Sequence, residues 1–399
     1  MSIADHPTRT SVPGRFTPDD VRLEDLAEVA SATTSLADHP HADRVEQGVL
    51  VYAAARLREA VASQDGEDAV RAELVHAMAD GPGIVVVEGA WEHDVVDRAT
   101  DAFERLVAAE KAAGGTHGDH FARPGANDRV WNALEKLAVA DPGTFVDYYE
   151  NDVLALVSTA WLGPGYQVTS QVNVVRPGGL AQDPHRDYHL GFLDDDRAAR
   201  YPAHVHLLSP VLTLQGAVAH VDMPVESGPT LYLPHSQKYG PGYLAYRRDD
   251  VRAFFAEHHV QLPLAKGDAV FFNPALLHGA GTNVSADVQR LANLLQVSSA
   301  FGRAMEAVDR ARATTAVYPT LLRRKADGWP AERLARVVAA VAEGYPFPTN
   351  LDLDQPVDGM TPRTQAELVE RALAEDSDAD VVAAELAAYA DRRRTDGGA

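Results

Sequence analysis

The chain has 399 residues, of which 46% are hydrophobic and 24% charged, and its formal net charge is −22. Its length allows a large buried core, and its acidic balance disfavours nucleic acid and membrane surfaces as partners, because both carry phosphate. The complete absence of cysteine excludes disulfides, thiolate metal sites and cysteine nucleophiles, and leaves histidine and carboxylate as metal ligands.

The sequence also predicts a compartment. The first residues lack the basic segment and apolar run of a secretory signal. No apolar stretch reaches the roughly 18 residues that a membrane-spanning helix needs. We therefore expect a cytoplasmic protein with a small-molecule partner, and the sequence carries no signal for an oligomeric state.

The first 80 residues are predicted to be an arm followed by helices. Residues 1–18 are polar and contain three prolines, which indicates a flexible arm. Residues 19–80 repeat apolar residues at spacings of three and four, which predicts a helical N-terminal extension. One such stripe consists of Leu50, Ala54, Leu57 and Val61.

Residues 81–302 are predicted to form a β-rich core with supporting helices. A buried strand is expected at 83–89, and a helix is expected to follow it and to end at about Lys111. A Gly-rich loop comes next, and two more helices are expected at 128–139 and 143–161. Glycines and prolines separate the later strands, as in an antiparallel sandwich or a closed double-sheet barrel. These later strands are expected at 166–175, 207–221, 229–233, 260–264, 269–272 and 288–297. Residues 303–399 return to helical patterning and predict a C-terminal extension packed on the core.

A short motif, His185-Arg186-Asp187, gives the first chemical hypothesis. On an extended segment, side chains two residues apart face the same side. An imidazole and a carboxylate are two of the three ligands in the 2-His-1-carboxylate arrangement for iron(II), and His278 is the candidate for the third. Chance alone predicts about two His-x-Asp/Glu pairs in such a chain. The sequence holds four, so this pair alone is weak evidence.

The competing pair is His220 and Asp222, which also precedes His278. It lies where an apolar strand runs into a turn, which favours a hydrogen-bonded histidine beside the pocket. Further support for His185 comes from Arg290, which follows His278 by 12 residues within an apolar strand. A buried arginine is costly without an anionic partner, and its planar fork suits a carboxylate. The alternative is a surface arginine on an edge strand.

An ordered set of blocks resembles the phytanoyl-CoA dioxygenase family of iron(II)/2-oxoglutarate-dependent oxygenases. The resemblance covers roughly residues 80–302, and the ordered set is more specific than any single block. The blocks are the Pro-Gly bend at 177–179, His185-Arg186-Asp187, the stretch 226–238, the turn and strand at 267–272, the stretch 277–281 and finally Arg290.

The resemblance implies an α+β fold with a double-stranded β-helix, a jelly-roll or cupin-like core flanked by N- and C-terminal helices. It implies that His185, Asp187 and His278 bind iron(II). Arg290 would anchor the distal carboxylate of 2-oxoglutarate, and Asn173 would contact the same co-substrate. These residues would make the protein an oxygenase with O2 as second co-substrate.

The implied reaction hydroxylates or otherwise oxidises an unactivated C–H bond of a small-molecule metabolite, with release of succinate and CO2. Asp187 favours hydroxylation, because halogenating relatives lack this carboxylate. One departure is Ala280, which stands where relatives often carry a hydroxyl residue, so one hydrogen bond to the co-substrate is not expected here.

Six residues are candidates for the substrate pocket, with ordinary packing as the competing interpretation of each. They are Trp131, Arg186, Tyr188, His189, His220 and Tyr232. Two other functions compete with an oxygenase. One is a jelly-roll protein that binds a metabolite or metal without turnover. The other is a zinc or manganese hydrolase on the same three ligands, for which the sequence offers no clear general base.

Overall fold

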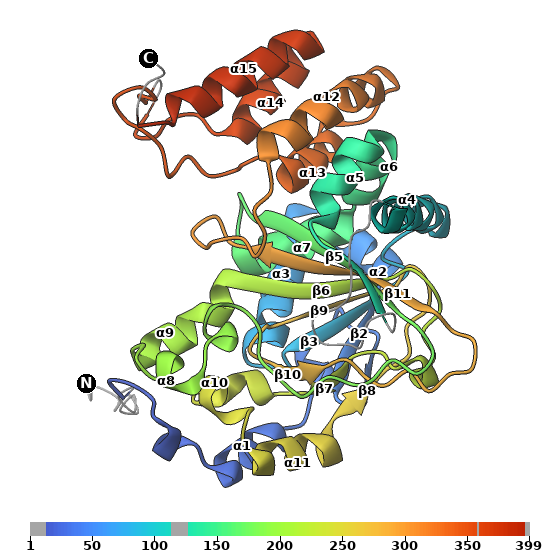
Figure 1. Ribbon diagram of the computed structural model, residues 1–399, viewed down its shortest axis with the longest axis vertical. Coiled ribbons are helices and arrows are strands. Elements are labelled where there is room, and N and C mark those ends of the chain that lie inside the picture. Colours follow the sequence, from blue (N-terminus) through green and yellow to red (C-terminus); the bar gives the residue numbers. More distant parts are fainter. Residues whose placement is uncertain (1–12, 113–126, 357–358, 396–399) are drawn as a thin grey trace.

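The structure, a computed structural model, describes residues 13–112, 127–356 and 359–395 (Figure 1). The predicted Gly-rich loop lies almost wholly outside these residues. Figure 1 shows layers stacked along the long axis. The C-terminal helices lie at the top, a second helical layer and the larger sheet lie below them, and the smaller sheet lies at the bottom with a further group of helices.

The core is the double-stranded β-helix that the sequence predicts. An eight-stranded sheet has the order β1-β2-β3-β9-β6-β11-β5-β4, and a three-stranded sheet has the order β10-β7-β8. The strand pairs are antiparallel except for β2 with β3. The strands are β1 (Arg44–Glu46), β2 (Val49–Ala53), β3 (Ile84–Glu88), β4 (Asn127–Val130), β5 (Gln167–Val175), β6 (Thr213–Ala219), β7 (Leu231–Leu233), β8 (Val260–Gln261), β9 (Ala269–Phe272), β10 (Leu277–Gly279) and β11 (Arg290–Ser298).

Fifteen α-helices surround the sheets within the described residues. They are α1 (Leu23–Ala30), α2 (Ala54–Ala60), α3 (Gln64–Ala79), α4 (His93–Ala112), α5 (Ala133–Ala140), α6 (Pro142–Tyr149), α7 (Asp152–Leu162), α8 (Asp195–Ala198), α9 (Ala203–Leu208), α10 (Gly242–Ala245), α11 (Asp249–His258), α12 (Arg310–Ala326), α13 (Ala331–Val341), α14 (Gln365–Ala374) and α15 (Ala379–Arg392). Within the described parts of the chain, no helix combines the length and apolar character needed to cross a membrane.

The larger sheet has two different faces. On β3, Val85 and Val87 belong to the core cluster beneath the helices, whereas Ile84 and Val86 face the space between the sheets. This period-two alternation explains why every residue of the strand except its last is buried. One face therefore holds the helical layer, and the other forms the wall of a cavity.

The prediction that residues 19–80 are helical is wrong at 44–53. Val49–Ala53 is strand β2, which pairs with β1 and runs parallel to β3. A parallel strand buried on both faces reads as a continuous apolar run, so its periodicity resembles that of a buried helix. Residues before position 81 thus complete the larger sheet.

Two further expectations need correction. The expected strand at 207–221 begins only at Thr213, because α9 and a 3-10 turn around Pro210 precede it. The expected helix at 128–139 starts with the edge strand β4, and α5 begins only at Ala133.

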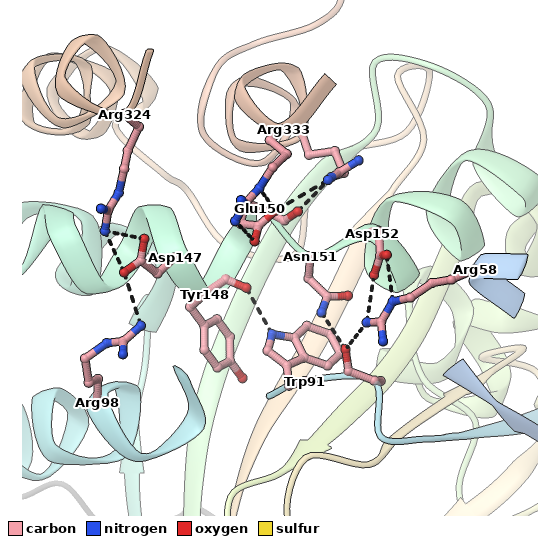
Figure 2. A network of polar contacts seen from close by, with 12 residues as sticks. Arg58, Trp91, Arg98, Asp147, Tyr148, Glu150, Asn151, Asp152, Arg324 and Arg333 are labelled. Atoms are coloured by element: carbon pink, nitrogen blue, oxygen red, sulfur yellow. Dashed lines mark hydrogen bonds and ion pairs between the residues drawn. The ribbon is translucent and has the colours of Figure 1, made fainter. Parts of the chain in front are cut away.

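Ion pairs tie the C-terminal helices to the helical layer. Figure 2 shows Asp147 of α6 between two arginines, with Arg324 of α12 donating to both its oxygens at 2.6 and 2.8 Å and Arg98 of α4 donating at 3.1 Å. Glu150, just after α6, accepts a hydrogen bond from Arg333 of α13 at 2.5 Å. The end of α6 therefore joins α4 to the C-terminal helices α12 and α13.

Replacing Asp147 with alanine is expected to lower the free energy of unfolding by about 1–2 kcal/mol, because the carboxylate is largely buried and joins a network of charges. Urea denaturation measures this change. The matched control is Asp94→Ala, which removes the other, exposed partner of Arg98 and should cost less than about 0.5 kcal/mol. Equal effects of the two substitutions would contradict a structural role for the network.

Candidate metal centre

Two histidines 93 residues apart are brought together by backbone pairing. His185 donates its N–H to the carbonyl oxygen of His278 at 2.9 Å, and His278 donates back at 3.2 Å. This bridge places the segment with His185 beside β10 of the smaller sheet, and the two imidazole rings have centroids 4.5 Å apart. Asp187 is held near them by its own N–H, which donates to the carbonyl oxygen of Pro274 at 3.2 Å.

The three side chains converge on one point. His185 Nε2 lies 3.7 Å from Asp187 Oδ1, and His278 Nε2 lies 3.5 Å from Asp187 Oδ2. Of all His, Asp and Glu residues in the described parts of the chain, these three form the one group whose candidate ligand atoms lie within 4.8 Å of one another. Two imidazoles and one carboxylate could hold a divalent metal and leave further positions open.

Backbone carbonyls orient both imidazoles. His185 Nδ1 is 2.9 Å from the carbonyl oxygen of Asp183, and His278 Nδ1 is 2.9 Å from that of Leu276. A carbonyl only accepts, so each Nδ1 carries the proton and each Nε2 presents its lone pair toward Asp187. This second layer of hydrogen bonds is the usual way in which proteins fix a metal-binding histidine.

Electrostatics favour the protonation states that metal binding needs. Burial alone would raise the pKa of the Asp187 carboxyl, but His185, His278 and the Gln215 amide outweigh it and hold this pKa well below its usual range. Burial lowers the pKa of His185 in spite of the neighbouring carboxylate. The carboxyl is therefore ionised and the imidazole neutral at physiological pH.

The chain turns sharply after Asp187. Tyr188 and His189 have φ angles of 61° and 40°, in the left-handed region that non-glycine residues rarely adopt. Arg186 points away from the metal ligands and into the protein, where it donates to the carbonyl oxygens of Ser236 at 2.6 Å and Tyr239 at 3.0 Å. Arg186 nevertheless lines the cavity between the two sheets, so its assignment to the substrate pocket stays a prediction.

A cavity of about 840 Å³ lies between the two sheets and includes the three candidate ligands among its lining. Arg290, the first residue of β11, lines this cavity and is only 6% exposed. Its Nη1 has no hydrogen-bond partner among the described residues, and no acidic side chain there pairs with it. Burial lowers its pKa to about 10, so it stays charged near neutral pH. A buried cation without a counter-ion fits an anionic ligand, and a carboxylate matches its geometry.

Asn173 lines the same cavity from β5, where it stands opposite Ala292 of β11. It is therefore one step diagonally from Arg290, whose direct partner on β5 is Val175. The Oδ1 of Asn173 is also buried without a hydrogen-bond partner among the described residues. The co-substrate contact expected for Asn173 is compatible with this placement.

The other pocket candidates divide into two groups. Trp131 and Tyr232 line the cavity. Tyr188 and His189 do not: His189 Nδ1 lies 2.9 Å from the hydroxyl of Ser209, and the Tyr188 hydroxyl is buried. Their assignment to the substrate pocket is therefore corrected.

His220 is a packed histidine on the far face of the larger sheet. Its neighbour Ala219 faces the cavity, so the alternation of the strand turns His220 toward the helices. Its Nδ1 lies 2.9 Å from Thr100 Oγ1, and its Nε2 lies 2.9 Å from the Tyr148 hydroxyl. Its side chain therefore lies outside the cavity. His220 is neither a residue of the pocket nor an alternative to His185 as a metal ligand.

Burial lowers the pKa of His220 to about 3. An unfolded chain binds a proton at this residue near pH 6.5, whereas the folded chain does not. The free energy of unfolding should therefore fall by up to about 1.4 kcal/mol per pH unit as the pH drops below about 6.5 toward 3. Urea denaturation of the wild type and of His220→Gln between about pH 6.5 and 4 isolates this contribution. Parallel pH curves for the two proteins would contradict it.

Sequence reasoning missed Gln215, the third residue of β6. It lines the cavity, and its side-chain amide donates to Asp187 Oδ2. The signal was present, because an amide within the apolar run 213–219 has the same need for a partner as Arg290 does in its own strand. Other missed lining residues are Arg129, Gln171, Gln296, Arg247 and Arg252.

The comparison with protein families gives one match. The family model described as phytanoyl-CoA dioxygenase (PhyH) matches residues 79–292, more than half of the chain. This span includes the three candidate ligands and Arg290. No curated protein sequence matches the chain.

Several solved structures are similar to the chain. SnoN, a non-heme alpha-ketoglutarate-dependent epimerase from nogalamycin biosynthesis, is 20% identical, with 60% of this chain and 85% of SnoN covered and a TM-score of 0.39. AviO1 from Streptomyces viridochromogenes Tue57 is 19% identical, with coverages of 59% and 97% and a TM-score of 0.42. HygX from Streptomyces hygroscopicus, solved with nickel, 2-oxoglutarate and hygromycin B, is 15% identical, with coverages of 58% and 88% and a TM-score of 0.42.

Proposed function

The chain belongs to the phytanoyl-CoA dioxygenase family, an iron(II)- and 2-oxoglutarate-dependent class, and we propose that it hydroxylates an unactivated C–H bond of a small-molecule metabolite. One observation carries the proposal. The convergent group of His185, Asp187 and His278 opens into the same cavity as Arg290, a buried cation without a counter-ion. The site thus offers donors for a divalent metal and a partner for a dicarboxylate.

Each residue has a defined task in this proposal. His185, Asp187 and His278 hold iron(II), and the carbonyls of Asp183 and Leu276 keep the imidazoles in the tautomer that binds metal. Iron bound there supplies the activation of O2, coupled to oxidative decarboxylation of 2-oxoglutarate to succinate and CO2.

The co-substrate side of the cavity is set by β5 and β11. Arg290 binds the distal carboxylate of 2-oxoglutarate through its fork, and Asn173 contacts the co-substrate from the neighbouring strand. Apolar residues around them, including Ala292 and Leu294, exclude water from this part of the cavity. Exclusion of water lowers the local dielectric constant and so strengthens the attraction between the guanidinium and the carboxylate.

The remaining space suits a small-molecule substrate. A volume of about 840 Å³ exceeds the need of a five-carbon dicarboxylate and falls in the range of pockets for drug-sized ligands. Trp131 and Tyr232 add aromatic surface, while Gln171 and Gln296 add amide groups. This mixture supports a substrate with both apolar and hydrogen-bonding parts.

The proposal is tested by supplying purified protein with iron(II) and 2-oxoglutarate and measuring O2 consumption and succinate release. Uncoupled turnover that requires both additions is expected even without the substrate. Addition of small-molecule metabolites should then identify the compound that accelerates it. Metal and 2-oxoglutarate binding without any succinate release would instead favour a non-catalytic binding protein.

A further inference from the structure

Gln215 is a polar residue in an unfavourable place. It is 6% exposed and lies on β6, near the middle of the larger sheet, opposite Phe272 of β9 on one side and Gln296 of β11 on the other. The other cavity-facing side chains of β6 are Ala217 and Ala219. A buried amide in such a strand is costly unless it has a hydrogen-bond partner.

The partner of Gln215 is the candidate metal ligand Asp187. The ionised carboxylate can only accept, so the amide must present its Nε2 to Asp187 Oδ2. This fixes the orientation of the amide and turns Oε1 away, where it is buried without a hydrogen-bond partner among the described residues. An unsatisfied buried acceptor costs about 1–3 kcal/mol. The hydrogen bond to Asp187 therefore leaves the Oε1 of the same amide unsatisfied, which costs free energy of folding.

Asp187 needs such a restraint because no strand holds it. It lies between the bridge residue His185 and the left-handed residues Tyr188 and His189. Its carboxylate could rotate and offer both oxygens to a metal. The observed contacts oppose this rotation, since Oδ2 accepts from Gln215 and lies 3.5 Å from His278 Nε2, while Oδ1 lies 3.7 Å from His185 Nε2.

We propose that Gln215 is a positioning residue of the metal centre, which fixes the orientation of the Asp187 carboxylate so that it meets the metal through a single oxygen. A single carboxylate oxygen with two imidazoles leaves three positions of an octahedral ion open, whereas a second oxygen would occupy one of them. A neutral amide achieves this without cancelling the negative charge of the carboxylate, as arginine or lysine would. This inference rests on the proposed function.

The test compares Gln215→Met with Gln296→Met, loaded with cobalt(II) alone. Both changes replace a cavity-facing amide by an apolar side chain of similar length, and the two residues are direct cross-strand partners. Gln296 accepts from Gln171 Nε2 at 3.3 Å, and the structure shows no hydrogen bond from it to the three candidate ligands. Cobalt(II) affinity and the intensity of its visible absorption, which reports coordination number, are the readouts.

Gln215→Met is expected to bind cobalt(II) about 10–100-fold more weakly and to change its visible spectrum, while Gln296→Met keeps the affinity and spectrum of the wild type. Thermal unfolding without metal checks that both variants are folded, and Gln215→Ala serves if Gln215→Met is not. Wild-type affinity and spectrum in a folded Gln215 variant would overturn the inference, as would equal effects in both variants. Failure of the wild type itself to bind cobalt(II) would instead overturn the proposed function.

Discussion

Asp187→Ala is expected to abolish 2-oxoglutarate-dependent succinate release and to weaken iron(II) binding by about 10²–10³-fold, which corresponds to about 3–4 kcal/mol. Asp187 provides the one anionic ligand of the site. Without it, two neutral imidazoles remain beside an open position, and the charge that balances the metal is lost. Metal titration and succinate analysis measure the two effects separately.

The matched control is Asp183→Asn. The Asp183 side chain is 77% exposed, whereas its backbone carbonyl, which orients His185, is unchanged by the substitution. This variant should bind metal as the wild type does. Full metal affinity in Asp187→Ala would contradict the assignment, and equal losses in both variants would show that the effect is not specific to the ligand.

Arg290→Met is expected to raise the KM for 2-oxoglutarate by about 10²–10³-fold, because two charge-assisted hydrogen bonds of about 1.5–3 kcal/mol each are lost. Iron(II) affinity should be unchanged, since Arg290 makes no contact with the three ligands. Arg290→Lys should lie between the wild type and Arg290→Met, as it keeps the charge but loses the fork. Steady-state kinetics with varied 2-oxoglutarate give these values.

The control for this prediction is Arg247→Met. Arg247 also lines the cavity, but its guanidinium is already engaged by Asp195 at 2.7 Å and by the carbonyl oxygen of Leu193 at 2.6 Å. Its replacement should leave the KM for 2-oxoglutarate near the wild-type value. A normal KM in Arg290→Met would show that another group binds the distal carboxylate.

The sequence predicts those strands that are marked by their own residues and by the turn residues beside them. The strand β9 at 269–272 is bounded by a glycine turn before it and Asn-Pro after it, and β5 is followed by the Pro-Gly bend at 177–179. The strand β2 was not predicted, because its burial on both faces depends on β1 and β3, which the local pattern does not include. Its apolar run therefore resembled part of a helix.

In the candidate site, too, some features could be predicted from the sequence and others depend on how the chain folds. The grouping of His185 with His278 followed from the order of blocks along the chain, and the structure joins them by backbone pairing across 93 residues. The position of His220 follows from alternation beside the inward-facing Ala219, and this rule could have removed His220 from the pocket, whereas Arg186 lines the cavity. Gln215 could not be paired with Asp187 in advance, because their contact depends on how the turn after the motif folds over β6.

The most direct test of the central claim is an anaerobic titration of 2-oxoglutarate into iron(II)-loaded protein, followed by visible absorption. Chelation of 2-oxoglutarate to iron(II) gives a charge-transfer band that neither component shows alone. We expect a band that saturates at stoichiometric 2-oxoglutarate, needs higher concentrations in Arg290→Met and is absent in Asp187→Ala. A protein that binds iron(II) but develops no such band would contradict an iron(II)/2-oxoglutarate centre at His185, Asp187 and His278.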